Sequence, residues 1–193
     1  MPPVVGVLAL QGDFEAHSKI LAELGAEARP VRTAADLEGI DGLVIPGGES
    51  TSITLGIERE ALAEPLRRLV ELGKPVLGTC AGMIILDRDH LGLLDVSVRR
   101  NAFGRQLQSF ESDLELRGLG TNGVVRAIFI RAPWVEETGE GVEVLGEVDG
   151  HPVAVREDNV LAVAFHPELS GDGRLHAWLL EAAGASRNGD EPR

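Results

Sequence analysis

The sequence predicts a single-domain α/β protein with a doubly wound, largely parallel sheet and an antiparallel extension. Strand and helix patterns alternate through the first half of the chain, as they do where helices cover both faces of a parallel sheet. After residue 94 the apolar segments become shorter and more alternating, which favours antiparallel strands. The 193 residues suffice for one well-buried core and are too few for two typical domains.

The first half of the chain contains the expected parallel strands and their helices. Residues 4–10 form an unbroken apolar run, which predicts a strand buried on both faces. Residues 13–24 place apolar side chains on one helical stripe, and Gly25 ends that helix. The remaining expected elements are a short capped helix at residues 33–36, a third strand at 42–45, a helix at 58–72 ended by Gly73, and a strand at 75–79.

The second half is expected to extend the sheet with antiparallel strands before a closing helix at residues 174–183. The expected strands cover residues 124–130, 142–148, 153–156 and 160–165. The last residues are polar and include Gly and Pro, which predicts disorder. We therefore expect one domain over residues 1–184 and a disordered tail over residues 185–193.

Charge and cysteine content exclude several kinds of protein. The chain has 31 acidic and 18 basic side chains and a formal net charge of −13, which disfavours a nucleic acid or a membrane as partner. A single cysteine excludes an internal disulfide framework and fits a reducing compartment. No apolar stretch approaches the roughly 20 residues of a membrane span, and the first residues lack the basic segment of a signal peptide. We expect a cytoplasmic protein.

Cys80 is the most informative residue of the chain. It lies at the apex of Gly78-Thr79-Cys80-Ala81-Gly82, directly after one apolar run and directly before another. A strand, turn and helix of this kind push the side chain out at the carboxyl end of a sheet, as in a nucleophile elbow. Free N–H groups at the helix start favour the thiolate over the thiol. A lone cysteine is most often a small buried hydrophobe, but such a cysteine does not need a turn on both sides. Cys80 is therefore a candidate nucleophile.

His166 and Glu168 supply a candidate base and a group that orients it. They belong to His166-Pro167-Glu168, which follows the last apolar run. In an extended chain the two side chains point to the same side, because side chains alternate with a period of two. A fragment of this kind is ordinarily a solvated loop. Combined with Cys80 it is more specific, because catalytic Cys and His are typically distant in sequence and adjacent in the fold.

A third fragment, Pro46-Gly47-Gly48-Glu49-Ser50-Thr51, follows the expected third strand and precedes a helix. Its backbone N–H groups are expected on the same rim as Cys80. The N–H groups of Gly48 and Ala81 are candidate oxyanion donors for a tetrahedral intermediate. The alternative is a phosphate cradle, since glycine-rich turns before helices bind anions. Neither phosphate-binding glycine motif occurs here, and Glu49 repels a phosphate.

Six blocks of the sequence together resemble one family. In chain order they are Leu8-Ala9-Leu10-Gln11-Gly12, Pro46-Gly47-Gly48-Glu49-Ser50-Thr51, Gly78-Thr79-Cys80-Ala81-Gly82, Arg100-Asn101-Ala102-Phe103-Gly104-Arg105-Gln106, Phe129-Ile130-Arg131-Ala132-Pro133 and Phe165-His166-Pro167-Glu168-Leu169. They are similar to blocks of the glutaminase subunits of pyridoxal 5′-phosphate synthases, a branch of the class I glutamine amidotransferase-like family. The fourth and fifth blocks narrow the match to this branch, since a generic class I amidotransferase shares only the cysteine elbow and the His-x-Glu.

The resemblance implies hydrolysis of L-glutamine to L-glutamate and ammonia through a Cys-His-Glu triad, without a cofactor. It implies that ammonia passes to a partner synthase subunit that makes pyridoxal 5′-phosphate. Cys80 is then the nucleophile, His166 the general base and acid, and Glu168 the group that orients His166. The implied glutamine-binding positions are Gly48, Glu49, Ser50, Arg105, Ile130 and Arg131.

The resemblance also implies a hetero-oligomer in which the glutaminase is nearly silent until it docks on the synthase. Gly47 and Gly48 offer a physical means, because glycine tolerates peptide orientations that other residues resist. Gln11 ends the first apolar run and is expected at the same edge of the sheet. We expect Gln11 and Gly47 to sense the partner.

Two other classes of protein remain open. A cysteine peptidase or stress-response protein of the same broad fold often carries His directly after Cys, where this chain has Ala81. A non-catalytic binding protein does not need a His-Pro-Glu together with a glycine-flanked cysteine. No metal is expected, because His17, His90, His151 and His176 form no ligand-spaced cluster with the single cysteine.

Overall fold

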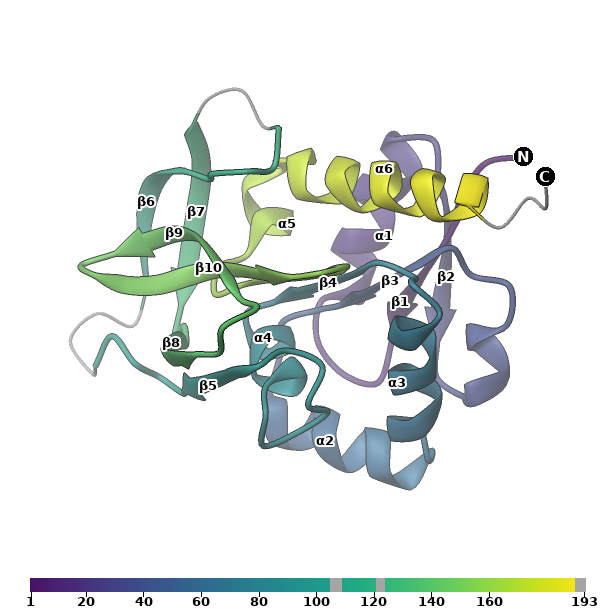
Figure 1. Cartoon of the computed structure of the whole chain (residues 1–193), viewed down its shortest axis with the longest axis horizontal. Coiled ribbons are helices and arrows are strands. Elements are labelled where there is room, and N and C mark those ends of the chain that lie inside the picture. The colour runs from purple at the N-terminus through teal and green to yellow at the C-terminus, as the bar shows by residue number, and fades with distance from the viewer. Residues whose placement is uncertain (105–108, 121–123, 190–193) are drawn as a thin grey trace.

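The computed structural model describes residues 1–104, 109–120 and 124–189, and a seven-stranded sheet lies at its centre (Figure 1). The strands in spatial order are β2 (Glu27–Val31), β1 (Val4–Leu8), β3 (Gly42–Ile45), β4 (Val76–Thr79), β11 (Val160–Val163), β10 (His151–Glu157) and β9 (Glu143–Val148). From β2 to β11 each neighbouring pair is parallel, whereas β10 pairs antiparallel with both β11 and β9. The predicted doubly wound sheet with an antiparallel extension is confirmed.

Helices cover both faces of this sheet (Figure 1). One face carries α1 (Phe14–Glu23), α5 (Pro167–Ser170) and α6 (Arg174–Gly189), and the other carries α2 (Ser50–Arg59), α3 (Ala63–Glu71) and α4 (Ala81–Leu86). A short 3₁₀ helix, η1 (Ala34–Leu37), follows β2. Every residue of β3, β4 and β11 is buried, because both faces of these central strands lie under helices.

Two small antiparallel sheets lie on the side of the molecule where β9 and β10 are found (Figure 1). One pairs β5 (Val96–Arg99) with β8 (Trp134–Thr138), and the other pairs β6 (Ser109–Glu115) with β7 (Val124–Ile130). The strand expected at residues 124–130 is therefore present, but the prediction that it extends the central sheet is wrong. Its alternate residues are buried, and Phe129 stacks on Phe110 at 4.5 Å between ring centroids, so β6 and β7 form a layer of their own.

The single helix expected at residues 58–72 is wrong, because the chain turns between α2 and α3. Ala61 has a φ of 51°, and the N–H groups of Ala61 and Leu62 donate back to the carbonyls of Glu58 and Ile57. This pattern is a Schellman cap, which ordinarily carries glycine at the left-handed position. Residue 61 is Ala and not Gly, so the sequence contains no signal for a helix end at this position, and the helical pattern continues across the turn. Leu62 is fully buried by the turn.

The closing helix is longer than expected. It continues to Gly189, and the hydroxyl of Ser186 donates hydrogen bonds to the carbonyls of Gly73 and Ala182. Disorder is predicted from residue 185 onward, whereas α6 continues to Gly189, and residues 190–193 lie outside the described part of the chain. Strand β2 was not predicted, because its residues do not form an apolar run. It is an edge strand, where Pro30 is tolerated because one side of an edge strand needs no partner.

Candidate active site

Cys80 stands between β4 and α4 with a φ of 49° and a ψ of −105°. A positive φ is uncommon for a residue with a side chain, and its strain must be offset by surrounding contacts. The Cys80 N–H donates to the carbonyl of Val163 at 2.8 Å, and the Cys80 carbonyl accepts from the N–H of Met83 at 3.0 Å. These bonds hold the thiol at the carboxyl edge of the parallel strands.

The glycines that flank Cys80 allow close packing around it. A Cβ on Gly78 would lie 2.5 Å from Cδ1 of Leu86, and a Cβ on Gly82 would overlap the carbonyl oxygen of Ile45. Neither glycine has a positive φ. The sequence analysis assigned them to a turn, but the structure shows that they let α4 approach β3 and β4. The strained turn residue is Cys80 itself.

His166 is the N-cap of the short helix α5, and Pro167 occupies the first turn. The expected extended geometry at His166 and Glu168 is wrong, because β11 already ends at Val163. The two side chains still meet: Nδ1 of His166 lies 2.6 Å from Oε1 of Glu168. The backbone N–H of His166 donates to the carbonyl of Ile128 on β7 at 2.9 Å, which anchors the base to the smaller sheet.

The electrostatics of His166 favour its protonated form. Burial alone lowers the pKa of the imidazole, but hydrogen bonds to Cys80 and Glu168, together with their negative charges, outweigh burial and raise the pKa to about 10. Because Glu168 occupies Nδ1, the remaining nitrogen, Nε2, is the one available to Cys80. Thiol, imidazole and carboxylate therefore form one line of contacts from two separate parts of the chain, the β4–α4 junction and the start of α5.

A pocket of about 400 Å³ opens above Cys80 and His166. Most of the predicted site residues line it, namely Gln11, Gly48, Glu49, Ser50, Ala81, Ile130 and Arg131. The carbonyl of Ile130 accepts a weak hydrogen bond from the Cys80 thiol at 3.9 Å. The predicted binding residue Arg105 lies outside the described residues.

Gly47 and Gly48 form a glycine segment beside the triad, in which Gly48 lines the pocket and Gly47 packs against His166 and Cys80. A Cβ on Gly47 would lie 2.6 Å from Cε1 of His166 and 3.2 Å from Cβ of Cys80, so only glycine fits without displacing the base. Gly48 has a φ of 154°, and a Cβ there would overlap Oε1 of Gln11. That same oxygen of Gln11 accepts the N–H of Glu49 at 2.6 Å. The glycine segment is thus held by the end of β1.

Glu49 has a structural task in addition to lining the pocket. Its carboxylate caps α2 by accepting the N–H groups of Thr51 and Ser52, and these hydrogen bonds lower the pKa of Glu49. Arg100 donates to the same carboxylate at 3.2 Å and lines the pocket beside it. Arg100 belongs to one of the six blocks that carry the resemblance, but it was not among the predicted glutamine-binding residues.

Two buried side chains below the triad were also missed. His17 on α1 and Thr79 on β4 are both fully buried, and Nε2 of His17 lies 3.2 Å from Oγ1 of Thr79. A histidine on the apolar stripe of a helix is indistinguishable in sequence from a core residue, so no local signal identifies it. Within the described ranges, no three or more His, Cys, Asp or Glu side chains are arranged to hold a metal ion.

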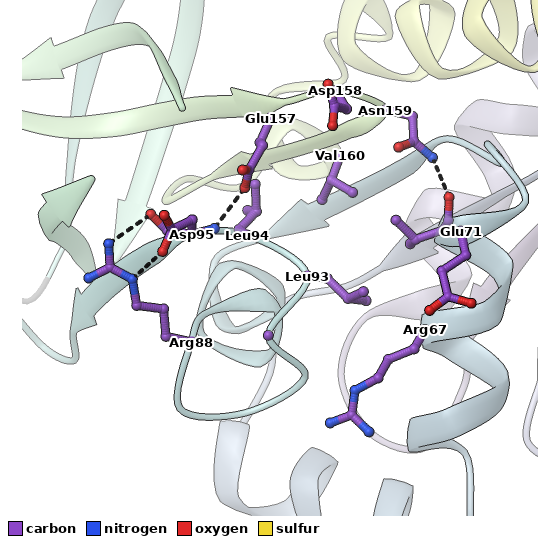
Figure 2. Close-up of a pocket in the computed structure, with 12 residues that line it drawn as sticks. Arg67, Glu71, Arg88, Leu93, Leu94, Asp95, Glu157, Asp158, Asn159 and Val160 are labelled. Atoms are coloured by element: carbon purple, nitrogen blue, oxygen red, sulfur yellow. Dashed lines mark hydrogen bonds and ion pairs between the residues drawn. The ribbon is translucent and has the colours of Figure 1, made fainter. Parts of the chain in front are cut away.

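A larger hollow, of about 570 Å³, lies at the opposite end of the sheet, where β11 begins (Figure 2). Several of its charged and polar groups bond to their neighbours in the protein. Arg88 pairs with Asp95, and Glu157 accepts the N–H of Asp95 (Figure 2). Asn159 donates to the carbonyls of Val70 and Lys74. The residues that line the hollow include no Cys, Ser, Thr, His or Lys, so we place the site at the smaller pocket.

Comparison with known proteins agrees with this arrangement. Residues 7–184 match the sequence model of the SNO glutamine amidotransferase family. Proteins named pyridoxal 5′-phosphate synthase subunit PdxT from Acidothermus cellulolyticus and Mycobacterium avium are each 53% identical to this chain; the matches cover 95% and 93% of it and 95% and 96% of the relatives. A crystal structure described as a glutamine amidotransferase superposes with a TM-score of 0.88 at 49% identity and covers 93% of this chain and 98% of its own.

The doubly wound sheet with a cysteine elbow facing a His-Glu pair is the architecture of a glutamine amidotransferase of the α/β type. This chain belongs to the SNO glutamine amidotransferase family. The resemblance drawn from the six sequence blocks is therefore confirmed. None of the helices in the described part of the chain is both long and apolar enough to span a membrane.

Proposed function

We propose that Cys80, His166 and Glu168 carry out the hydrolysis of L-glutamine in this chain, which is the glutaminase subunit of a pyridoxal 5′-phosphate synthase. The observation that carries the residue assignment is the contact of His166 with Glu168 through Nδ1 at 2.6 Å, which leaves Nε2 to Cys80. A nucleophile, a base in contact with it and a third group that orients the base are the parts that covalent acyl transfer needs.

The reaction follows from these contacts. His166 holds the proton that the Cys80 thiol gives up, and Sγ attacks the side-chain amide carbon of glutamine. The tetrahedral intermediate collapses as His166 donates its Nε2 proton to the leaving ammonia, which leaves a thioester on Cys80. His166 then takes a proton from water, whose oxygen attacks the thioester carbon. Glutamate leaves, and Cys80 recovers its proton.

The N–H groups of Gly48 and Ala81 are the oxyanion donors in this proposal. Ala81 directly follows the nucleophile, and both residues line the pocket with Cys80. Donors aimed at the developing oxyanion stabilise the transition state more than the substrate. The close approach of Gly47 to His166 and Cys80 supports this role, because it brings the glycine segment against the reacting atoms.

The pocket supplies charges that suit the two ends of an amino acid. Arg131 and Arg100 offer cations for the α-carboxylate, and Glu49 offers an anion for the α-ammonium group. Gly48, Ser50 and Ile130 complete the wall beside them. A volume of about 400 Å³ is within the range of small-molecule sites and accommodates glutamine. We keep Arg105 as a further proposed contact.

The partner in this proposal is the synthase subunit, which receives ammonia and switches the glutaminase on by docking. Gln11 is exposed at the pocket rim and bonds to the N–H of Glu49, so a partner that contacts Gln11 acts directly on the glycine segment. Gly47 and Gly48 allow the peptide between them to turn. A cytoplasmic location fits a reduced Cys80 and is part of the proposal.

The test is glutamate release from glutamine by this chain alone and mixed with the synthase subunit. We expect the isolated chain to be slower by about 100- to 1000-fold, the usual cost of one missing oxyanion donor. Glutamine is expected to tighten the complex in turn, because linkage between two binding events is reciprocal. Equal glutamate release with and without the synthase, and an affinity that glutamine leaves unchanged, would contradict the docking switch.

A further inference from the structure

Two histidines that the proposed mechanism does not use lie buried beneath the triad. His17 on α1 and His176 on α6 are each fully buried, and Nδ1 of His17 lies 2.9 Å from Nε2 of His176. Their rings are tilted by 42° with centroids 5.1 Å apart. Buried polar groups are costly unless they are hydrogen-bonded, so a paired imidazole at the centre of a helix-sheet interface requires a physical reason.

His17 contacts the support of both halves of the site. Its Nε2 atom lies 3.4 Å from Oε2 of Glu168 and 3.2 Å from Oγ1 of Thr79. Glu168 holds His166 through its other oxygen, and Oγ1 of Thr79 accepts the N–H of Gly47 at 3.1 Å. The imidazole of His17 therefore lies between the carboxylate of Glu168, which contacts His166, and the hydroxyl of Thr79, which contacts Gly47.

The surroundings select one tautomer of the pair. If Nε2 of His17 were unprotonated, its lone pair would face the Glu168 carboxylate, and Nδ1 of His176 would be a buried donor. Nδ1 of His176 has no hydrogen-bond partner, and neither has Oε2 of Glu168 at ordinary hydrogen-bond geometry. An orphaned buried N–H is rarer than an unpaired acceptor. The favoured arrangement has N–H on Nε2 of both rings, so that His176 donates to His17 and His17 donates toward Glu168.

Both rings are neutral in this arrangement. Burial, followed by repulsion from the protonated forms of His176 and His166, lowers the pKa of His17 well below its usual value. Burial also lowers the pKa of His176 to about 4, against the charge of Asp172, which raises it. Neutral rings at neutral pH have one N–H each, which the contacts with Glu168 and His176 place on Nε2.

We propose that His17 is a positioning residue whose Nε2–H is shared between Oγ1 of Thr79, its hydrogen-bond partner at 3.2 Å, and Oε2 of Glu168 at 3.4 Å, so that it holds that carboxylate against His166 and ties it to the glycine segment. Hydrogen bonds of this kind are often long before substrate is bound and shorten in the complex. The effect on glutamine turnover rests on the proposed function, whereas the effect on Cys80 rests on the geometry alone.

The experiment measures the alkylation rate of Cys80 by iodoacetamide as a function of pH in the full chain. Without His17, Glu168 is free to turn away from His166, so the imidazolium loses its partner and the thiol gives up its proton only at higher pH. We expect H17L to raise the pH of half-maximal alkylation by about one unit. H17Q retains a donor at the same reach and is expected to restore most of the wild-type profile.

The rate of glutamine hydrolysis with the synthase present gives a second test of the proposal. H17L is expected to lower kcat by up to about 100-fold, the cost of a small misplacement of a catalytic group, with KM within about threefold of wild type. H90Q is the matched control, because His90 bonds to Asp87 away from the pocket. Its alkylation profile and kcat are expected to equal those of wild type.

Circular dichroism and thermal unfolding establish that each variant is folded. If H17L does not fold, H176L is compared with H17Q. H176L removes the group that fixes the tautomer of His17, so it is expected to raise the pH of half-maximal alkylation of Cys80. A folded H17L with the wild-type midpoint, or an H17Q as impaired as H17L, overturns the proposal. Wild-type protein that releases no glutamate even with the synthase overturns the proposed function instead, while the alkylation profile still tests His17.

Discussion

The two ends of the parallel strands differ in how their polar side chains are partnered. At the amino end, in the hollow of Figure 2, Arg88, Asp95 and Asn159 form hydrogen bonds and ion pairs within the protein. At the carboxyl end, Cys80 occupies a strained conformation, and His166 has a pKa raised to about 10. The amino-end hollow is the larger of the two, at about 570 Å³ against 400 Å³.

This contrast shows that volume does not identify a functional site in this fold. A strained backbone conformation and a buried group with a shifted pKa both reduce the stability of the fold, and proteins retain them mainly at functional sites. The charges that are paired at the other end, such as Arg88 with Asp95, contribute to the fold. Parallel strands also aim the start of the next helix at their carboxyl end, so nucleophiles collect there.

The largest effect is expected for C80S, which removes the nucleophile from the carboxyl end. Glutamate release in the presence of the synthase is expected to fall by about 10,000-fold or more, because an alcohol is too weak an acid for the same imidazole to activate. The fold is expected to remain intact. Mass spectrometry is expected to find a thiol-alkylating glutamine analogue on Cys80 in wild-type protein. Near-normal glutamate release by C80S would remove Cys80 from the mechanism.

A smaller effect is expected for G47A. The added Cβ would lie 2.6 Å from Cε1 of His166, so the ring must shift away from Cys80. A displacement of this size is expected to lower kcat by about 100-fold and to reduce the free energy of unfolding by about 1 to 3 kcal/mol. G184A is the control, since a Cβ there meets nothing within 4 Å. If G47A and G184A have equal kcat, the glycine segment does not constrain the base.

The smallest effect is expected for N159A at the amino end. Its amide donates to the carbonyls of Lys74 and Val70 at 2.6 and 3.3 Å, and their loss is expected to cost about 1 kcal/mol of unfolding free energy. Urea denaturation measures that cost. The kcat of the folded variant is expected to equal that of wild type. A fall in kcat of tenfold or more would show that the two ends of the strands are coupled.

The sequence alone was sufficient to predict a feature where that feature depends on residues that are neighbours along the chain. Cys80 between glycines predicted the elbow, and His166 with Glu168 predicted a pair that the structure places at 2.6 Å, although from a helix start and not from a strand. The break at Ala61 was missed, because its left-handed conformation is imposed by the burial of Leu62 and not by a glycine.

The sequence by itself determined the fold class, the family and the candidate nucleophile, because each is encoded in residues that are neighbours along the chain or in blocks of fixed order. Only the tertiary structure decided that His17, Thr79 and Arg100 support the site. These side chains act through partners 32 to 151 positions away along the chain, namely Glu49 for Arg100, Gly47 for Thr79 and Glu168 for His17. Which residues become partners depends on how the folded chain buries them and brings them close in space. A pattern of neighbouring residues does not contain that information.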